Sequence, residues 1–312
     1  MILSPSPHIK SGSDTAKIML DVMIALAPAG VASLFIFGFH ALVVLADTVV
    51  AAVLAEYISR KVMKRKSTVG DLSAVVTGIL LAFSLPPTIN PLYAAFGAVV
   101  AIVVVKQMFG GIGNNFVNPA LAARIVLLVS FPSAMTSWTA PIVLGKKTVD
   151  AVSCATPLTM HLNGEETALR DLFLGTTGGC IGETCALALI VGGVYLVIRR
   201  VISPVIPLVY VGTAAAAALL LGEDPLFHVL SGGLLLGAIF MATDYTTSPV
   251  TFKGKIVYAV GCGILTVLIR VFGNLPEGVS FSILLMNILT PLIERATRPK
   301  PFGEGVRALE KT

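Results

Sequence analysis

Charged residues are scarce in this chain. Asp, Glu, Lys and Arg make up 12% of its 312 residues, about half of their share in an average soluble domain. Hydrophobic residues make up 55%, and the mean hydropathy is +0.90. A chain of this length has too few polar residues to cover a soluble core. The composition excludes a soluble globular protein and predicts that many apolar side chains face lipid.

Two patterns of redox and nucleotide-binding enzymes are also missing. No G-x-G-x-x-G follows a strand-like run, so we expect no dinucleotide site on this chain. The four cysteines lack C-x-x-C spacing, which argues against an iron–sulfur or zinc site within it. The four histidines show no ligand spacing either, so we predict packing or interfacial positions for them and no metal site. These residues are Cys154, Cys180, Cys185, Cys262, His8, His40, His161 and His228.

Long apolar runs are abundant. Runs of roughly 17–22 residues recur from end to end, each long enough to cross a bilayer core. We therefore predict an all-α polytopic membrane protein with about ten transmembrane helices. Their expected ranges are 19–38, 39–59, 72–90, 92–110, 116–131, 182–198, 201–221, 227–243, 255–273 and 279–294.

The positive charges are distributed unevenly between these runs. If both termini are cytoplasmic, the cytoplasmic segments hold 17 Lys and Arg residues, including Lys106, and the outer segments hold 4, with Arg124 inside a helix. Positive residues concentrate in cytoplasmic loops because this bias guides insertion. We thus expect membrane halves over 1–131 and 182–294, about five helices each, and a cytoplasmic tail over 295–312.

One long connection, residues 132–181, separates the two halves and is expected on the outer face. Long loops in compact proteins are usually functional. The connection runs into a glycine-rich segment, residues 175–184 (GTTGGCIGET). Glycine lets backbone amides approach a ligand closely, and a following helix N-terminus attracts anions. The spacing fits a phosphate-bearing ligand and a flexible re-entry turn equally well.

Two pairs of dipeptides indicate a possible internal repeat. Asn90-Pro91 opens an apolar run that ends in Asn118-Pro119, and Asp224-Pro225 opens one that ends in Ser248-Pro249. Five helices in each half would invert the second copy relative to the first, as in many transporters, with a ligand site at the repeat interface. Chance similarity between apolar runs is the alternative.

Several stretches resemble those of one family. They are 6–9 (SPHI), 18–22 (IMLDV), 118–124 (NPALAAR), 178–184 (GGCIGET) and 241–249 (MATDYTTSP). On these residues the chain resembles the RnfD/NqrB family. That family contains the D subunit of the Rnf ion-translocating ferredoxin:NAD oxidoreductase and the B subunit of the sodium-translocating NADH:quinone reductase. The resemblance covers nearly the whole chain, and of the two the chain is more similar to the Rnf protein.

The resemblance implies a covalent flavin. In that family FMN is attached through its phosphate to a threonine hydroxyl in a Ser/Asp-Gly-Ala/Ser-Thr motif. Thr156 is the matching threonine here, and Cys154 departs from the usual glycine, which bears on whether a flavin transferase accepts this chain. The matching segment is Ser153, Cys154, Ala155, Thr156, Pro157 and Leu158. The alternative attachment residues are Thr148, Thr159, Thr176 and Thr177.

Residues in the motifs that border the loop are candidates for the flavin pocket. Arg124 suits a flavin phosphate or carbonyl oxygen, because guanidinium donors match phosphate geometry. An Arg–carboxylate pair that holds helices together is the alternative. The candidate pocket residues are Asn118, Arg124, Gly178, Gly179, Glu183 and Thr184.

Carboxylates within the apolar runs are candidates for an ion path. Ionisable groups in hydrocarbon are costly and are therefore candidates for function. Asp21, Asp47 and Asp244 offer oxygens that suit a hard cation. Helix-end or interhelical polar contacts explain them as well.

The resemblance also implies a function and partners. The chain would be a membrane flavoprotein subunit of a complex that passes electrons between ferredoxin and NAD, coupled to Na⁺ or H⁺ translocation across a bacterial or archaeal cytoplasmic membrane. The quinone-reductase relative implies a second, noncovalent flavin such as riboflavin. The expected partners are the other Rnf subunits, one of them an extracytoplasmic FMN-bearing subunit, and a flavin transferase. The alternatives are a counterpart of the quinone reductase's B subunit, and a non-redox solute transporter or channel with inverted repeats.

Overall fold

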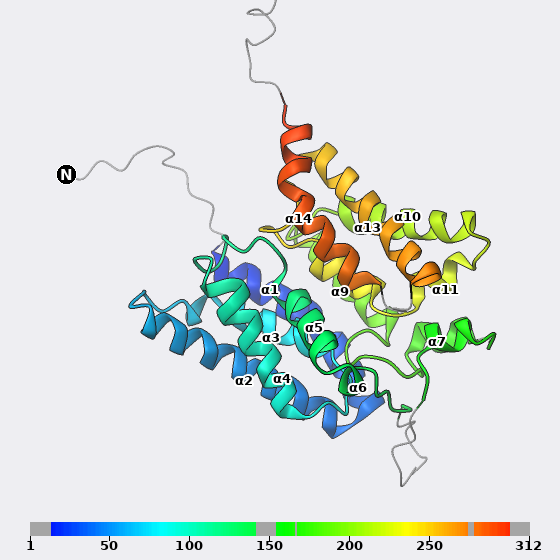
Figure 1. Cartoon of the computed structure of the whole chain (residues 1–312), viewed down its shortest axis with the longest axis horizontal. Helices are drawn as coiled ribbons and strands as arrows, with labels where there is room; N and C mark the ends of the chain where they lie inside the picture. The colour runs from blue at the N-terminus through cyan, green and yellow to red at the C-terminus, as the bar shows by residue number, and fades with distance from the viewer. Residues whose placement is uncertain (1–13, 142–153, 166, 274–277, 300–312) are drawn as a thin grey trace, which may run out of the picture.

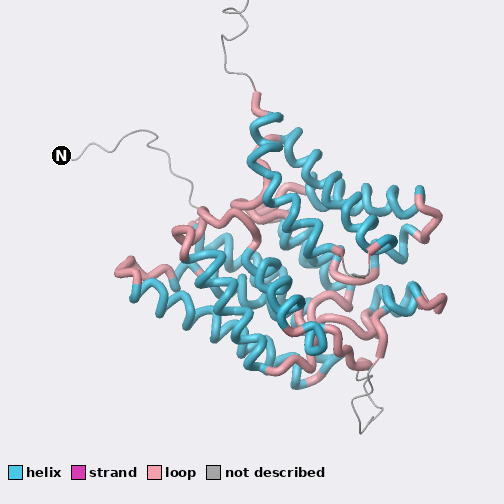
Figure 2. Tube along the Cα trace, in the orientation of Figure 1, coloured by secondary structure: helices cyan, strands magenta, loops and turns pink. Residues whose placement is uncertain are grey.

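The computed structural model describes residues 14–141, 154–165, 167–273 and 278–299. These residues form helices joined by loops, with no strand among their elements (Figure 2). The elements before the long connection are α1 (Thr15–Phe37), α2 (Phe39–Val62), η1 (Val69–Asp71), α3 (Ser73–Phe83), α4 (Pro91–Val99), η2 (Val100–Gln107) and α5 (Pro119–Ser130). Those of the connection are α6 (Pro132–Met135), α7 (Pro157–Leu162) and α8 (Leu169–Leu174). The last group is α9 (Ala186–Ile198), α10 (Val205–Leu220), α11 (Pro225–Leu230), α12 (Leu234–Leu236), η3 (Gly237–Met241), α13 (Phe252–Phe272) and α14 (Val279–Thr297).

Most of the predicted apolar runs are helical. Four helices, α1, α2, α13 and α14, are long and apolar enough to cross a membrane. The shorter apolar helices are α3, α4 with η2, α5, α9 and α10. The predicted span 227–243 is not one continuous helix, because it is broken into α11, α12 and η3. The break contains Gly232 at φ 60°, a conformation that glycine adopts at little steric cost.

Four helices begin in the same way, with a polar cap followed by proline. The side chains of Asn90, Asn118, Thr156 and Asp224 each accept a hydrogen bond from a backbone N–H of the first turn of α4, α5, α7 and α11. Proline at the first helical position costs no hydrogen bond, since that N–H has no partner within the helix. The Asn-Pro, Thr-Pro and Asp-Pro dipeptides therefore act as helix starts.

Ser248-Pro249 differs from these dipeptides. The helix that follows, α13, begins at Phe252 and is capped by Thr251, whose hydroxyl accepts a hydrogen bond from Gly254 N at 3.1 Å. Ser248-Pro249 is thus not the structural counterpart of Asn118-Pro119, with which the repeat hypothesis pairs it.

The two halves contact each other through α1 and α9 and through α5 and α14, while α2 packs against α3 and α4, and α10 against α13. Large apolar side chains on the outside of these helices are exposed. Examples are Phe35, Phe39, Val62, Leu220 and Phe272, each more than 60% exposed. An exposed apolar surface of this extent, on a protein whose core is also mostly apolar, is the arrangement expected of a protein in lipid.

The long connection lies away from the ends of the described chain. Figure 1 shows the start of α1 and the end of α14 on the upper side of the view, whereas α6 and α7 lie on the lower side. Its glycine-rich end is tied to the N-terminal half, since Ile181 N and Gly182 N donate to Leu85 O and Phe83 O at 3.0 and 2.9 Å. A Cβ at residue 182 would overlap the Phe83 ring, so glycine is required there.

The α1–α9 contact provides a test of the packing. A Cβ on Gly192 of α9 would overlap the carbonyl oxygen of Ala25 in α1, whereas Gly212 of α10 has open space around it. Small residues allow helices to approach closely in membranes. We expect Gly192→Ala to lower the melting temperature of the purified protein. Gly212→Ala should leave it unchanged or raise it, since Ala is about 1 kcal/mol better than Gly within a helix.

A thiol-reactive dye can follow this melting, because Cys180 and Cys262 are fully buried in the folded protein. Equal melting temperatures for the two variants would contradict the close α1–α9 packing.

Candidate functional site

Thr156 is the N-cap of α7. Its backbone is extended, and its hydroxyl accepts a hydrogen bond from Thr159 N at 3.3 Å and lies 2.8 Å from Thr159 Oγ1. The residue is 9% exposed. The hydroxyl is therefore held at a defined position at the start of the helix. Ser153 and Thr148 lie outside the described residues.

A small cavity adjoins Thr156. Its volume is about 20 Å³, which is room for about one water molecule. Four of the predicted pocket residues line it together with the last three residues of the predicted attachment segment. The lining residues are Thr156, Pro157, Leu158, Leu172, Thr177, Gly178, Gly179, Glu183, Thr184, Leu230 and Gly232. The fold thus brings the glycine-rich run back to the threonine, although 21 residues of sequence lie between Thr156 and Gly178.

Cys154 packs against this glycine-rich run. Its N–H donates to Trp138 O at 3.0 Å, and a Cβ at residue 178 would overlap its Sγ atom. Partial burial raises the pKa of the Cys154 thiol, although a backbone hydrogen bond opposes the shift. The thiol is therefore neutral at pH 7 and fills space beside Gly178.

Arg124 and Glu183 face each other behind the glycine-rich run. Arg124 Nη1 lies 4.0 Å from Glu183 Oε2, and both side chains are 5% exposed. Arg124 Nη2 also donates to Cys180 Sγ at 3.3 Å, while Glu183 Oε1 accepts from Cys180 N at 3.2 Å. The structure shows the Arg–carboxylate pair that the sequence allowed as an alternative, and it links α5 to the chain just before α9.

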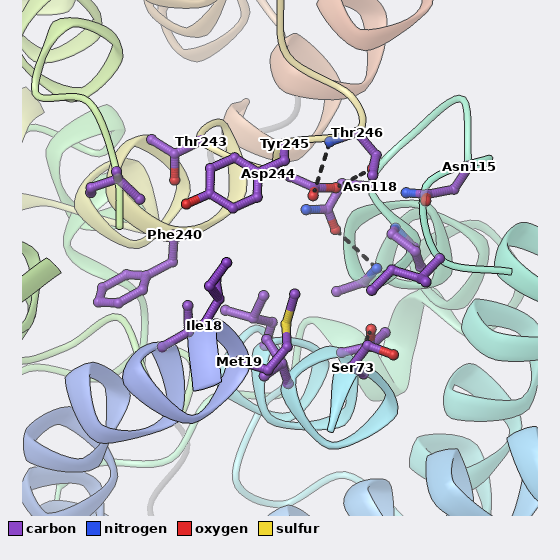
Figure 3. Close-up of a pocket in the computed structure, with 18 of the residues that line it drawn as sticks. Ile18, Met19, Ser73, Asn115, Asn118, Phe240, Thr243, Asp244, Tyr245 and Thr246 are labelled. Carbon is purple, nitrogen blue, oxygen red and sulfur yellow. Dashed lines mark hydrogen bonds between the residues drawn. The ribbon is translucent and has the colours of Figure 1, made fainter. Parts of the chain in front are cut away.

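Asn118 lies elsewhere. It lines a larger cavity of about 110 Å³ between the two halves, with Nδ2 donating to Met241 O at 3.3 Å. Figure 3 shows Asn115, Asn118, Asp244 and Thr246 along one side of this central cavity and Ile18, Met19 and Ser73 along the other. The predicted flavin-pocket residues are therefore separated: Gly178, Gly179, Glu183 and Thr184 line the cavity beside Thr156, Asn118 lines the central cavity, and Arg124 lines neither.

The three predicted ion-path aspartates do not come together. Asp244 lines the central cavity, and its Oδ2 accepts from Thr246 Oγ1 and Thr247 Oγ1 at 3.1 and 3.3 Å. Asp21 accepts from the Tyr195 hydroxyl at 2.9 Å and pairs with Arg199 at 3.3 Å. Asp47 is on α2, where its Oδ2 is buried without a hydrogen-bond partner among the described residues.

A buried ion pair at the central cavity escaped the sequence analysis. Lys106, which lines the cavity from η2, lies 3.0 Å from Glu56 Oε2 and donates to Ser73 Oγ at 2.5 Å. Glu56 also accepts from the Thr68 hydroxyl. The charge count assigned Lys106 to a cytoplasmic segment, but the π-helical turn of η2 directs it into the protein, where it is 3% exposed. The one indication of this buried pair in the sequence was a lysine, Lys106, within a predicted apolar helix.

A family model covers almost the full chain. The model of the NQR2, RnfD, RnfE family matches residues 2–303. The chain belongs to this family. The resemblance found in the sequence motifs is thereby confirmed.

Curated relatives of this NQR2/RnfD/RnfE-family chain carry matching names. It is 51% identical over 308 residues to the D subunit of the Na⁺-translocating ferredoxin:NAD⁺ oxidoreductase complex of Acetobacterium woodii, covering 97% of this chain and 95% of the relative. It is 44% identical to the proton-translocating counterpart of Clostridium ljungdahlii, over 96% of each chain. It is 39% identical to the D subunit of the ion-translocating oxidoreductase complex of Stutzerimonas stutzeri, over 95% and 94%. Together with the apolar helices, these relatives support a multi-pass membrane protein.

The Lys106–Glu56 pair in this family member makes a testable contribution to stability. Lys106→Met leaves the Glu56 carboxylate buried without its counter-charge, which costs about 3–5 kcal/mol. We expect a lower melting temperature by the thiol-dye assay. The double variant Glu56→Gln with Lys106→Met removes both charges and should recover most of the loss. A single variant as stable as the unmodified protein would contradict the pairing.

Proposed function

We propose that this chain is the D subunit of an Rnf-type ferredoxin:NAD oxidoreductase and that it carries FMN on Thr156. In that complex it contributes to electron transfer between ferredoxin and NAD, coupled to Na⁺ or H⁺ translocation. The proposal is supported by the family membership and by the relatives, whose names place them in such complexes. The observation that carries the flavin assignment is the position of the Thr156 hydroxyl beside the glycine-rich run.

The residues around Thr156 fit a phosphoester. A flavin transferase would move the flavin phosphate to the hydroxyl from a flavin dinucleotide: the hydroxyl loses its proton and bonds to the phosphorus, the pyrophosphate bond of the donor breaks, and the nucleoside monophosphate leaves. Gly178 and Gly179 lie close by without side chains, and Thr177 and Thr184 add hydroxyl groups to the same cavity. A flavin bound there supplies one- and two-electron redox chemistry, whereas the protein sets its position and surroundings.

The ring of this flavin must lie outside the cavity beside Thr156. A cavity of about 20 Å³ holds a small group and no three-ring system. Glu183 in its wall is paired with Arg124, which limits the repulsion between its carboxylate and the phosphate. We therefore place the phosphate at the cavity and the ring beyond it, on the side of the long connection, facing an extracytoplasmic partner protein of the complex.

The central cavity, of about 110 Å³, is our proposed position for part of a second, noncovalent flavin such as riboflavin, since a whole flavin needs a pocket of about 300 Å³ or more. It is lined by apolar side chains from both halves and by the amides of Asn115 and Asn118. A few placed polar groups in an apolar pocket are typical of cofactor sites. Asp244 at the same cavity remains our candidate for the ion path, and Asp21 and Asp47 remain candidates outside it.

The helix contacts favour inverted repeats, but with a different pairing of helices. The dipeptides pair α4 with α11, whereas the contacts pair α4 with α13. In the first half α2 packs against α4, and in the second half α10 packs against α13. We propose that α1 to α5 correspond in order to α9, α10, the broken α11–η3 segment, α13 and α14. Pseudo-symmetric halves with a site between them would place the central cavity at the repeat interface.

Flavin attachment is tested by comparing Thr156→Val with Thr159→Val, both coexpressed with a flavin transferase. Valine removes the nucleophilic oxygen at either position with little change in shape. We expect Thr156→Val to lose in-gel flavin fluorescence completely. Thr159→Val should keep most of it, because Thr159 only positions the Thr156 hydroxyl.

Two results would overturn this assignment. Fluorescence retained in Thr156→Val would move the attachment to another threonine. Fluorescence absent from the unmodified chain, with an active transferase shown on a known acceptor protein, would remove the flavin assignment and favour a non-redox transporter.

A further inference from the structure

Two histidines and a glutamate meet where α7 of the long connection lies against the C-terminal half. His161 is on α7, Glu223 is in the turn after α10, and His228 is on α11. One ligand atom from each lies within 4.8 Å of the other two. His161 is far from the other two in the sequence, which is why the spacing predicted no metal site.

The individual distances suit a shared ion. Glu223 Oε2 lies 2.7 Å from His161 Nε2 and 3.8 Å from His228 Nε2. Tetrahedral Zn²⁺ with bonds of about 2.0–2.1 Å separates its ligand atoms by about 3.3 Å. The two observed distances lie on either side of this value. The 2.7 Å contact is a hydrogen bond in this structure, so a bound ion would replace it and Glu223 would move away from His161 and toward His228.

His228 provides a second, independent indication of a ligand. The residue is 3% exposed, and neither Nδ1 nor Nε2 has a hydrogen-bond partner among the described residues. Buried polar groups are nearly always hydrogen-bonded, so a buried imidazole whose neighbouring carboxylate, Glu223, lies 3.8 Å away calls for an explanation such as an ion. A cavity of about 40 Å³, lined by all three residues, adjoins the ring.

The surroundings define the class of ion. Two imidazole nitrogens with one carboxylate favour Zn²⁺ and similar first-row transition ions over Mg²⁺ or Ca²⁺, which prefer oxygen ligands only. Arg270 also lines the cavity and donates to the carbonyl oxygens of His228 and Ser231 at 2.5 and 3.0 Å. Its positive charge opposes a cation in this cavity, and the Glu223 carboxylate offsets that repulsion as an anionic ligand.

We propose that His161, Glu223 and His228 bind one Zn²⁺-class ion. His161 and Glu223 are 35% and 30% exposed at the side chain, so the ion enters from the aqueous side and a water molecule completes its coordination. The ion clamps α7, whose N-cap is Thr156, to the broken α11 segment. The site itself does not depend on flavin attachment.

The test measures zinc in the intact complex, purified without a polyhistidine tag and washed with a chelator. Zn²⁺ is titrated back, and tightly bound zinc is counted by mass spectrometry of the metal. His161→Gln and Glu223→Gln are compared with the matched control His40→Gln, whose side chain is exposed on α2. We expect the unmodified complex and the His40→Gln control to bind about one more Zn²⁺ per chain than His161→Gln and Glu223→Gln. In these two variants we expect the affinity for Zn²⁺ to be at least about tenfold weaker.

A spectroscopic measurement keeps the test independent of the variants. Co²⁺ loaded in place of Zn²⁺ should give the visible absorption bands of a tetrahedral nitrogen–oxygen site in the unmodified complex. The proposal is overturned if these bands are absent. It is also overturned if the unmodified complex retains no more zinc than His161→Gln and Glu223→Gln, or if His40→Gln loses as much zinc as they do.

Discussion

A polar group within hydrocarbon has no water to bind, and the rest of this structure follows from that constraint. Every helix end that reaches the apolar interior must satisfy its own N–H and C=O groups. Of the four capped starts, those of α5 and α7 are buried, and there the side chains of Asn118 and Thr156 accept hydrogen bonds from N–H groups of the first turn. Because these caps supply hydrogen bonds to N–H groups that would otherwise lack a partner, short helices and irregular backbone can lie inside the protein. The cavities lie at those places.

The same constraint arranges the charged side chains. Lys106 pairs with Glu56, Arg124 with Glu183, and Arg270 donates to two carbonyl oxygens. Each group lies near a broken element: η2, the glycine-rich run before α9, or the α11 segment. Buried polar side chains also lie on continuous helices, where they bond to one another, as Tyr210 of α10 does with Thr266 of α13 and Ser282 of α14. A flavin phosphate beside Thr156 and a metal ion beside His228 would both use this polar layer at the end of the C-terminal half.

Much of the fold was predictable from sequence because lipid imposes a simple rule on composition. Apolar runs indicated where helices lie, and the motifs indicated the family. The break in 227–243 was harder to predict, since α11 and η3 are as apolar as a continuous helix would be. Nothing in the sequence indicated that predicted flavin-pocket residues lie at two different cavities. Asn118 and Gly178 both border the long connection in sequence, but the cap of α5 faces the central cavity while the glycine-rich run faces Thr156. The convergence of His161 with His228 depends on tertiary contacts that no spacing rule contains.

The proposed redox role depends most on the chemical state of Thr156, and peptide mapping of the native protein measures it directly. Cleavage after Lys147 and Arg170 releases residues 148–170, which contain Thr148, Thr156 and Thr159, whereas Thr176 and Thr177 fall in the next peptide. Tandem mass spectrometry should find the mass of one FMN less one water on the first peptide, with the fragments locating it at Thr156. An unmodified 148–170 peptide, or the added mass on a different threonine, would contradict flavin attachment at Thr156.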